Sequence, residues 1–188
     1  MGQVISLVGM PGGGKSTVGR QLARQLGMRF VDSDTDIEAR LGEPIRTFFE
    51  RAGEAAFRDV ESAVLADILS RSGEMVLATG GGAVLREANR ELLHQGSTVL
   101  YLRSTPEELF RRLRHDTQRP LLQVRDPLAK LRELYVQRNG LYRQCAHFVL
   151  ETGRPTLHGL VNMALMQLEL AGVVDPSRVA ATVGAEPL

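Results

Sequence analysis

The stretch from Gly9 to Ser16, which reads GMPGGGKS, constrains the fold of this chain more than any other. It matches the pattern G-x-x-x-x-G-K-[ST], in which backbone amides surround phosphate oxygens and a lysine and a hydroxyl complete the cradle. An apolar run, residues 3–8, precedes it, and apolar residues at helical spacing follow it as far as Leu26. The motif therefore lies between a buried strand and the start of a helix, the setting it requires, and it predicts a site for ATP or GTP.

The residue types within this phosphate-binding loop, or P-loop, indicate what each position does. We expect the glycines to permit the inward backbone turn, Lys15 to reach the β- and γ-phosphates, and the Ser16 hydroxyl to ligate Mg²⁺. Only two of the 23 basic residues are lysines, so a lysine here supports a need for a compact charge. The alternative, a glycine-rich turn with a surface lysine, is disfavoured because the motif and its flanks both match. The expected ATP-binding residues of this segment are Gly12, Gly13, Gly14, Lys15, Ser16 and Thr17.

Strand and helix patterns alternate along most of the chain. Apolar runs predict strands at 3–8, 28–31, 75–78, 98–102 and 148–151. Helical spacing and start signals predict helices at 16–26, 35–41, 45–72 with a break near Gly53, 86–95, from 105, 126–145 and 156–170. Strands separated by helices imply an α/β three-layer sandwich with a central five-stranded parallel sheet.

Composition excludes several classes of protein. The 188 residues hold 23 basic and 22 acidic side chains, which is not the basic balance that nucleic-acid binding requires. No apolar run approaches the roughly 20 residues of a membrane-spanning helix, and the first residues lack the order of a secretory signal. A single cysteine, Cys145, excludes an internal disulfide framework and fits a reducing compartment. We therefore expect a cytoplasmic protein that binds neither nucleic acid nor membranes. We also expect a monomer.

The last part of the chain differs from the rest. Residues 171–188 are small and weakly apolar and include prolines. We expect one domain over residues 1–170, followed by a disordered tail at 171–188.

Two aspartates follow the second predicted strand, at the edge where open α/β sheets bind ligands. Asp32 and Asp34 are two positions apart, so both carboxylates can face one crevice. Asp32 is well placed to hold Mg²⁺ beside Ser16. Asp34 is a candidate for holding an acceptor hydroxyl, and the alternative is that it only caps the next helix.

Three consecutive glycines, Gly80, Gly81 and Gly82, follow the third predicted strand at the same edge. They permit close backbone approach to a small ligand, although a tight turn alone would also explain them. Most arginines are exposed, and periodicity does not separate site arginines from surface ones. The three that we single out are Arg58, Arg119 and Arg138.

Together these motifs resemble the shikimate kinases. The similarity covers residues 3–170, and the segments that carry it are GMPGGGKSTVGR at 9–20, DSD at 32–34, FRDVE at 57–61, VLATGGG at 76–82, RPLL at 119–122 and RNGLY at 138–142. Arg58-x-x-Glu61 followed by a hydrophobic pair and the triple glycine is typical of this family, whereas other P-loop kinases share only the first segment.

The resemblance implies ATP-dependent phosphorylation of the 3-hydroxyl of shikimate, giving shikimate 3-phosphate and ADP, with Mg²⁺, in the route to chorismate and the aromatic amino acids. It implies the nucleoside monophosphate kinase-like P-loop fold with a mobile lid at about residues 113–125. Shikimate and ATP would be the binding partners.

The resemblance also implies a role for each candidate residue. Asp34 would hold the accepting hydroxyl, Arg58 and Arg138 would clamp the shikimate carboxylate, and residues 80–82 would line the substrate. On the nucleotide side, Arg119 would be the lid arginine that reaches the transferring phosphate, and Arg112 and Arg154 would lie near adenine. Chemistry agrees, since arginine is the natural partner of a carboxylate and phosphoryl transfer needs positioning and charge neutralisation.

Two departures from the usual family pattern stand out. Pro11 is an unusual residue in the P-loop and should stiffen it, and His115 and Thr117 replace more basic lid residues. We expect effects on ATP affinity or lid motion, not on the reaction type.

Three other functions remain to be weighed. A gluconate kinase would share the P-loop and the architecture but would not require Arg58, the triple glycine and Arg138 together. A nucleoside monophosphate kinase would need a base-recognition pocket, which no feature of the sequence demands. A regulatory nucleotide-binding module is disfavoured because Lys15 and Asp34 are both intact.

Overall fold

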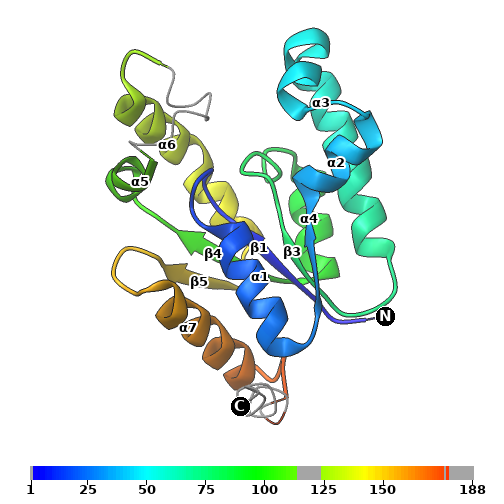
Figure 1. The fold of residues 1–188 in the computed structure, drawn as a ribbon, viewed down its shortest axis with the longest axis vertical. Coiled ribbons are helices and arrows are strands. Elements are labelled where there is room, and N and C mark those ends of the chain that lie inside the picture. The colour runs from blue at the N-terminus through cyan, green and yellow to red at the C-terminus, as the bar shows by residue number, and fades with distance from the viewer. Residues whose placement is uncertain (1, 114–123, 176, 178–188) are drawn as a thin grey trace, which may run out of the picture.

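Five parallel strands form the centre of the molecule (Figure 1). The structure, a computed structural model, describes residues 2–113, 124–175 and 177. Its strands are β1 (Val4–Val8), β2 (Arg29–Asp32), β3 (Met75–Ala78), β4 (Thr98–Arg103) and β5 (Phe148–Glu151). They lie in the order β2-β3-β1-β4-β5, and every neighbouring pair is parallel. This confirms the predicted sheet, and it brings the loops that follow β1, β2 and β3 together at one edge.

Helices cover both faces of the sheet, as expected for three layers. They are α1 (Lys15–Leu26), α2 (Ser33–Leu41), α3 (Ile45–Ser70), α4 (Glu87–Gly96), α5 (Pro106–Leu113), α6 (Pro127–Cys145) and α7 (Leu157–Leu170). Helices α1 and α7 contact each other on one face, while α4 contacts both α3 and α6 on the other (Figure 1). No helix in the described part of the chain is both long enough and apolar enough to cross a membrane.

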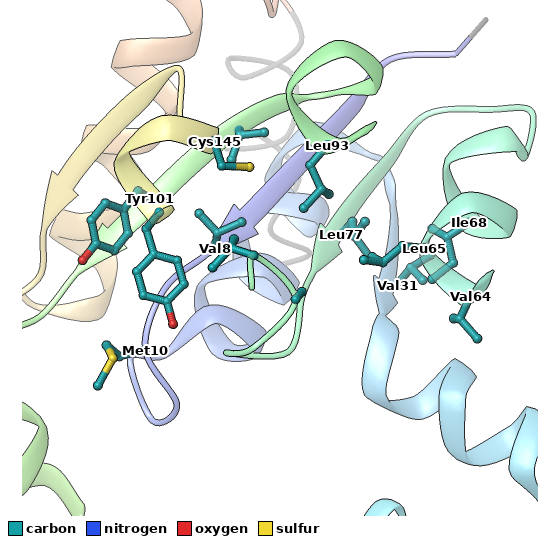
Figure 2. Close-up of a cluster of buried hydrophobic side chains, with 14 of the residues drawn as sticks. Val8, Met10, Val31, Val64, Leu65, Ile68, Leu77, Leu93, Tyr101 and Cys145 are labelled. Atoms are coloured by element: carbon teal, nitrogen blue, oxygen red, sulfur yellow. The ribbon is translucent and has the colours of Figure 1, made fainter. Parts of the chain in front are cut away.

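Two apolar clusters attach the helices to the sheet, and β1 contributes to both. Its five residues are all buried, as in a strand covered on both faces. Val4 and Val8 belong to the cluster beneath α3, α4 and α6, whereas Ile5 and Leu7 belong to the cluster beneath α1 and α7. This alternation is the period of two of an extended strand. Figure 2 shows part of the first cluster, including Val8, Met10, Val31, Val64, Leu65, Ile68, Leu77, Leu93, Tyr101 and Cys145.

Helix α2 begins at Ser33, two residues earlier than the sequence pattern predicts. The reason is a cap: Asp32 is extended, and its side chain accepts a hydrogen bond from the Asp34 amide at 3.0 Å. Asp34 is therefore not the capping residue, and the alternative role considered for it falls to Asp32. The predicted break in α3 is confirmed at Gly53, where φ is 84° and ψ is 173°.

The packed part of the chain extends beyond the expected domain end at residue 170. Val174 is buried in the cluster beneath α1 and α7, and Val173 packs against the same cluster. The side-chain amide of Gln3 also donates a hydrogen bond to the Val173 carbonyl. The remainder of the expected tail, residue 176 and residues 178–188, lies outside the described residues, as does most of the expected lid, residues 114–123.

Candidate active site

The loop between β1 and α1 has the backbone geometry of a phosphate cradle. Gly12 and Gly14 have φ of 78° and 88°, in the left-handed region that favours glycine. Lys15, the first residue of α1, is only 8% exposed. Its Nζ lies 2.9 Å from the carbonyl oxygens of both Gly9 and Met10. The ammonium is thus held against the loop, at the helix N-terminus where the dipole adds partial positive charge.

The two candidate magnesium ligands meet beside this loop. Ser16 Oγ donates to Asp32 Oδ2 at 2.6 Å, while the other carboxylate oxygen of Asp32 caps α2. The cap fixes the carboxylate, so its second oxygen remains directed at α1. Mg²⁺ prefers a few hard oxygen ligands from protein and completes its shell with water and substrate phosphates. A hydroxyl and a carboxylate in contact at the mouth of a phosphate cradle fit that requirement.

Asp34 lies where two cavities meet. One, of about 390 Å³, is lined by the P-loop and by the segment after β3: Pro11, Gly12, Gly14, Lys15, Ser16, Thr17, Asp32, Asp34, Thr79, Gly80 and Gly81. The other, of about 600 Å³, lies between α2 and α3 and is lined by Asp32, Asp34, Thr35, Glu38, Ile45, Arg46, Phe49 and Glu50. A group held by Asp34 can therefore face the phosphate cradle from the neighbouring cavity.

The surroundings of Asp34 alter its acidity. Partial burial and the neighbouring Asp32 carboxylate raise the pKa of Asp34 to about 6, and Lys15 acts in the opposite direction. Solvent still reaches the carboxylate from the open side of the site. Asp34 is thus a carboxylate whose pKa has moved toward neutrality, as is common for groups that accept a proton during catalysis.

Arg58 is fixed on α3 by a buried carboxylate. Its Nη1 donates to Glu61 Oε2 at 2.7 Å, and Glu61 is only 1% exposed. Burial raises the pKa of Glu61, and the hydrogen bond from Arg58 opposes that rise. The guanidinium also lies over the ring of Phe57, 5.1 Å from its centroid. These contacts hold the Arg58 side chain in one place near the middle of α3.

Arg138 approaches the same carboxylate from α6. It lies close enough to Glu61 to lower the pKa of that carboxyl, as Arg58 does. The Nε atoms of Arg58 and Arg138 are both buried and have no hydrogen-bond partner, a condition that only one other side chain of the described residues shares. Buried donors normally have partners, so these two guanidinium groups near one carboxylate keep donor capacity that no side chain of the described residues uses.

The triple glycine fits between these side chains. A Cβ on Gly80 would lie 2.9 Å from Asp34 Oδ1 and 3.2 Å from Glu61 Oε1. Residue 80 therefore separates the two carboxylates, and any side chain there would displace one of them. The close approach that the sequence suggested for these glycines is made here to protein side chains.

The candidates on the nucleotide side come from α5 and from the loop after β5. Arg112, on α5, donates to the Thr152 carbonyl at 2.7 Å and to its hydroxyl at 3.2 Å. Arg154 lies two residues further along that loop and is exposed. The structure thus brings Arg112 to the loop that carries Arg154. Thr17 is exposed and lines the cleft, while Arg119 lies outside the described residues, so its role stays a prediction.

Glu61 belongs to the FRDVE motif, but the sequence alone assigns it no role. The signal was available, because Glu61 continues the buried face of α3 with Phe57, Val64, Leu65 and Ile68. A carboxylate on the apolar face of a helix requires a partner, and Arg58 lies one turn away.

Comparison with known proteins identifies the family. A family model described as "Shikimate kinase" matches residues 11–169. This chain belongs to the shikimate kinase family. The shikimate kinase of Burkholderia pseudomallei (strain 1710b) is 56% identical over 170 residues, covering 90% of this chain and 92% of that one. The shikimate kinase of Ralstonia nicotianae is 53% identical over 172 residues, covering 92% and 90%.

Solved structures support the same family. "Shikimate kinase from Acinetobacter baumannii in complex with shikimate" is 43% identical and has a TM-score of 0.83, with 93% of this chain and 97% of that chain covered. A gluconokinase from Sinorhizobium meliloti has a TM-score of 0.60 at 20% identity, covering 90% and 93%, and so shares the fold alone. The resemblance inferred from the motifs is therefore confirmed, and the nucleoside monophosphate kinase-like P-loop fold with it.

Proposed function

We propose that this protein transfers the γ-phosphoryl group of ATP to the 3-hydroxyl of shikimate, giving shikimate 3-phosphate and ADP. The observation that carries the proposal is the pair of guanidinium groups, Arg58 and Arg138, that come near Glu61 from two different helices and each keep a buried nitrogen without a partner. A small hydroxylated carboxylate supplies what the site lacks, since its carboxylate pairs with arginine and a hydroxyl reaches Asp34. The Acinetobacter baumannii relative, named as a complex with shikimate, supports this choice of acceptor.

In this proposal Asp34 orients and deprotonates the acceptor. Its carboxylate accepts a hydrogen bond from the 3-hydroxyl, which directs the oxygen toward the phosphate cradle. The bond between that oxygen and the γ-phosphorus forms while the bond from the γ-phosphorus to the β–γ bridging oxygen breaks, and the hydroxyl proton passes to Asp34. With a pKa of about 6, Asp34 is mostly ionised at neutral pH and is ready to accept that proton.

The phosphate side supplies positive charge and fixed donors. The amides of residues 12–14 and the Lys15 ammonium would hold the β- and γ-phosphates as negative charge moves to the leaving oxygen. Ser16 and Asp32 would hold Mg²⁺, which when bound neutralises phosphate charge. Arg119, in a lid at about residues 113–125, would contact the transferring phosphate, and Arg112 and Arg154 would flank adenine. Closure of such a lid excludes the water that would otherwise hydrolyse ATP.

The location and the oligomeric state of the enzyme are also part of the proposal. We place the enzyme in the cytoplasm, where a single cysteine fits a reducing compartment, and we propose that it acts as a monomer. The test of the chemistry is the position of the phosphate. Phosphorus and proton NMR of the product should show one phosphate ester, coupled to the proton on carbon 3 of shikimate. An ester at another carbon would remove the assignment of the acceptor hydroxyl to Asp34.

A further inference from the structure

Gly81, the middle glycine of the triple-glycine turn, contacts both α6 and the P-loop. The Tyr142 hydroxyl, from α6, donates to the Gly81 carbonyl at 2.6 Å, across 61 residues of sequence. The ring of Pro11 in the P-loop also lies against this glycine, since a Cβ on Gly81 would be 2.7 Å from both Cδ and Cγ of that proline. Gly81 thus connects the acceptor-side turn to α6 and to the P-loop at once.

Tyr142 is built to act as a fixed donor. The residue is fully buried, and its ring packs against that of Tyr101 with centroids 5.0 Å apart. Burial raises the pKa of Tyr142 to about 12, so the phenol keeps its proton at any physiological pH. Arg138 lies four residues earlier on α6, on the same face, and its charge and a side-chain hydrogen bond with Tyr142 both oppose that rise in pKa. One helix face therefore carries both the anchor of the turn and a proposed carboxylate-binding arginine.

The neighbours of Gly81 explain why its position matters. Gly80 packs against Asp34, and Gly82 packs against the guanidinium of Arg58. Because Gly81 also lies against Pro11, a shift of the turn would change its contacts with Pro11, Asp34 and Arg58 together. The turn is thus the common support of the residues proposed to bind the acceptor.

We propose that Tyr142 is a positioning residue for the acceptor, which it serves by holding the turn at residues 80–82 against α6 while Pro11 holds it from the P-loop. This inference rests on the proposed function. It gives a role in acceptor binding to a residue that lies outside the two cavities beside Asp34. It requires that loss of the hydroxyl alone weakens acceptor binding and leaves nucleotide binding intact. A tyrosine that merely fills the core would lower stability without that selectivity.

The test is Tyr142→Phe, which removes the hydroxyl and keeps the ring. Tyr101→Phe is the matched control, because its equally buried hydroxyl donates to Asn139 Oδ1 at 3.0 Å and does not reach the turn. For Tyr142→Phe we expect the KM and the Kd for shikimate to rise roughly two- to tenfold, the range of one neutral hydrogen bond. The KM for ATP should stay within about twofold of the wild type, and Tyr101→Phe should leave both constants unchanged.

Calorimetry of shikimate binding to the wild-type chain separates the possible failures. No binding to the wild type would overturn the proposed function itself. Binding to the wild type together with equal affinity in Tyr142→Phe would overturn the positioning role alone, as would an equal rise in the KM for ATP. Gly81→Ala tests the same support from the other side and does not depend on Tyr142→Phe folding. Its methyl group would collide with Pro11, so an unchanged KM for shikimate in that variant contradicts the inference.

Discussion

The guanidinium of Arg58 occupies the space that a side chain at position 82 would fill. A Cβ on Gly82 would lie 2.7 Å from Arg58 Cζ, closer than real carbon contacts allow. The triple glycine therefore does more than turn the chain, since its last residue makes room for the arginine that Glu61 holds from behind. Helix α3 and the turn after β3, adjacent in space but separate in sequence, build this part of the site together.

Arg58→Ala should mainly weaken acceptor binding. A hydrogen bond to a charged group contributes about 1.5–3 kcal/mol, so the KM for shikimate should rise roughly 10- to 150-fold with little change in the KM for ATP. Arg132→Ala is the control, because Arg132 is an exposed arginine on α6 that pairs with Glu107. Steady-state kinetics with each substrate varied in turn measures both constants. An unchanged affinity for shikimate would mean that its carboxylate binds elsewhere.

Asp34→Asn should retain ATP binding and lose transfer. The amide cannot take the hydroxyl proton, and general-base contributions are typically 10²- to 10⁴-fold, so kcat should fall by about that factor. Nucleotide affinity, measured by calorimetry, should change by less than about twofold, because the P-loop and its lysine are untouched. Near-normal turnover in this variant would remove Asp34 from the mechanism.

The raised pKa of Asp34 predicts that activity falls at low pH, whereas the contribution of this residue to stability falls as the pH rises. Because the carboxylate must be ionised, kcat/KM for shikimate should decline below pH 6. The folded-state pKa of about 6 exceeds the ordinary value of 3.8, so ionisation disfavours the folded state. The stability that protonation provides is therefore lost as the pH rises through 6. Asp34→Asn should therefore be more stable than the wild type at pH 7.5, with the difference shrinking toward pH 4. A constant difference across this range would show that the pKa is not raised.

Ser16→Ala tests the proposed magnesium ligands. Ser16 Oγ and Asp32 Oδ2 are the proposed protein oxygens of the Mg²⁺ site, and the substitution removes the first. The Mg²⁺ concentration needed for half-maximal activity should rise about tenfold or more, since even the loss of an outer-shell partner typically costs 10–100-fold in metal affinity. Shikimate affinity in the absence of nucleotide should not change, because Ser16 lies on the phosphate side. Ser70→Ala, on the exposed end of α3, is a suitable control. An unaltered Mg²⁺ requirement would assign the ion to other groups.

His147 predicts a loss of stability in mild acid. Its Nδ1 accepts a hydrogen bond from the Val99 amide at 3.0 Å, and its ring stacks on His94 at 4.1 Å. Burial and His94 lower the pKa of His147 below 6.5, so its stabilising contribution is complete above pH 6.5 and is lost as the pH falls below it. His147→Asn, which keeps an acceptor near the same position, should reduce this pH dependence in urea unfolding at pH 7.5 and 5.5. His158→Asn, at an exposed position on α7, should behave as the wild type does.

The sequence predicts the sheet well, because buried parallel strands read as apolar runs. The bounds of β3 and β5 agree with those expected from the runs alone. The predicted start of α2 is two residues too late, because apolar periodicity does not reveal the side-chain cap that Asp32 provides. The predicted end of the domain, residue 170, is too early. Val174 lies in a weakly apolar stretch, and only its position beneath α1 and α7 makes it part of the core.

The candidate site also has features that the sequence predicts and features that it does not. The P-loop and the Ser16–Asp32 contact follow from local motifs placed on adjacent strands, so the sequence predicts them. The grouping of Arg58 and Arg138 near Glu61 depends on the places of α3 and α6 in the fold, which periodicity does not indicate, and only the family resemblance selected these arginines. The hydrogen bond from Tyr142 to Gly81 joins two distant segments and had no signal in either.

The measurement that tests the central claim most directly is ADP release with ATP and Mg²⁺ when shikimate, gluconate and a set of nucleoside monophosphates are offered separately. Turnover should occur with shikimate and stay at the background rate of ATP hydrolysis with the others, because only shikimate presents a carboxylate to the two arginines and a ring hydroxyl to Asp34. Turnover with gluconate or a nucleotide, and none with shikimate, would retain the fold and the phosphate cradle but contradict every acceptor-site assignment made for Arg58, Arg138 and Asp34.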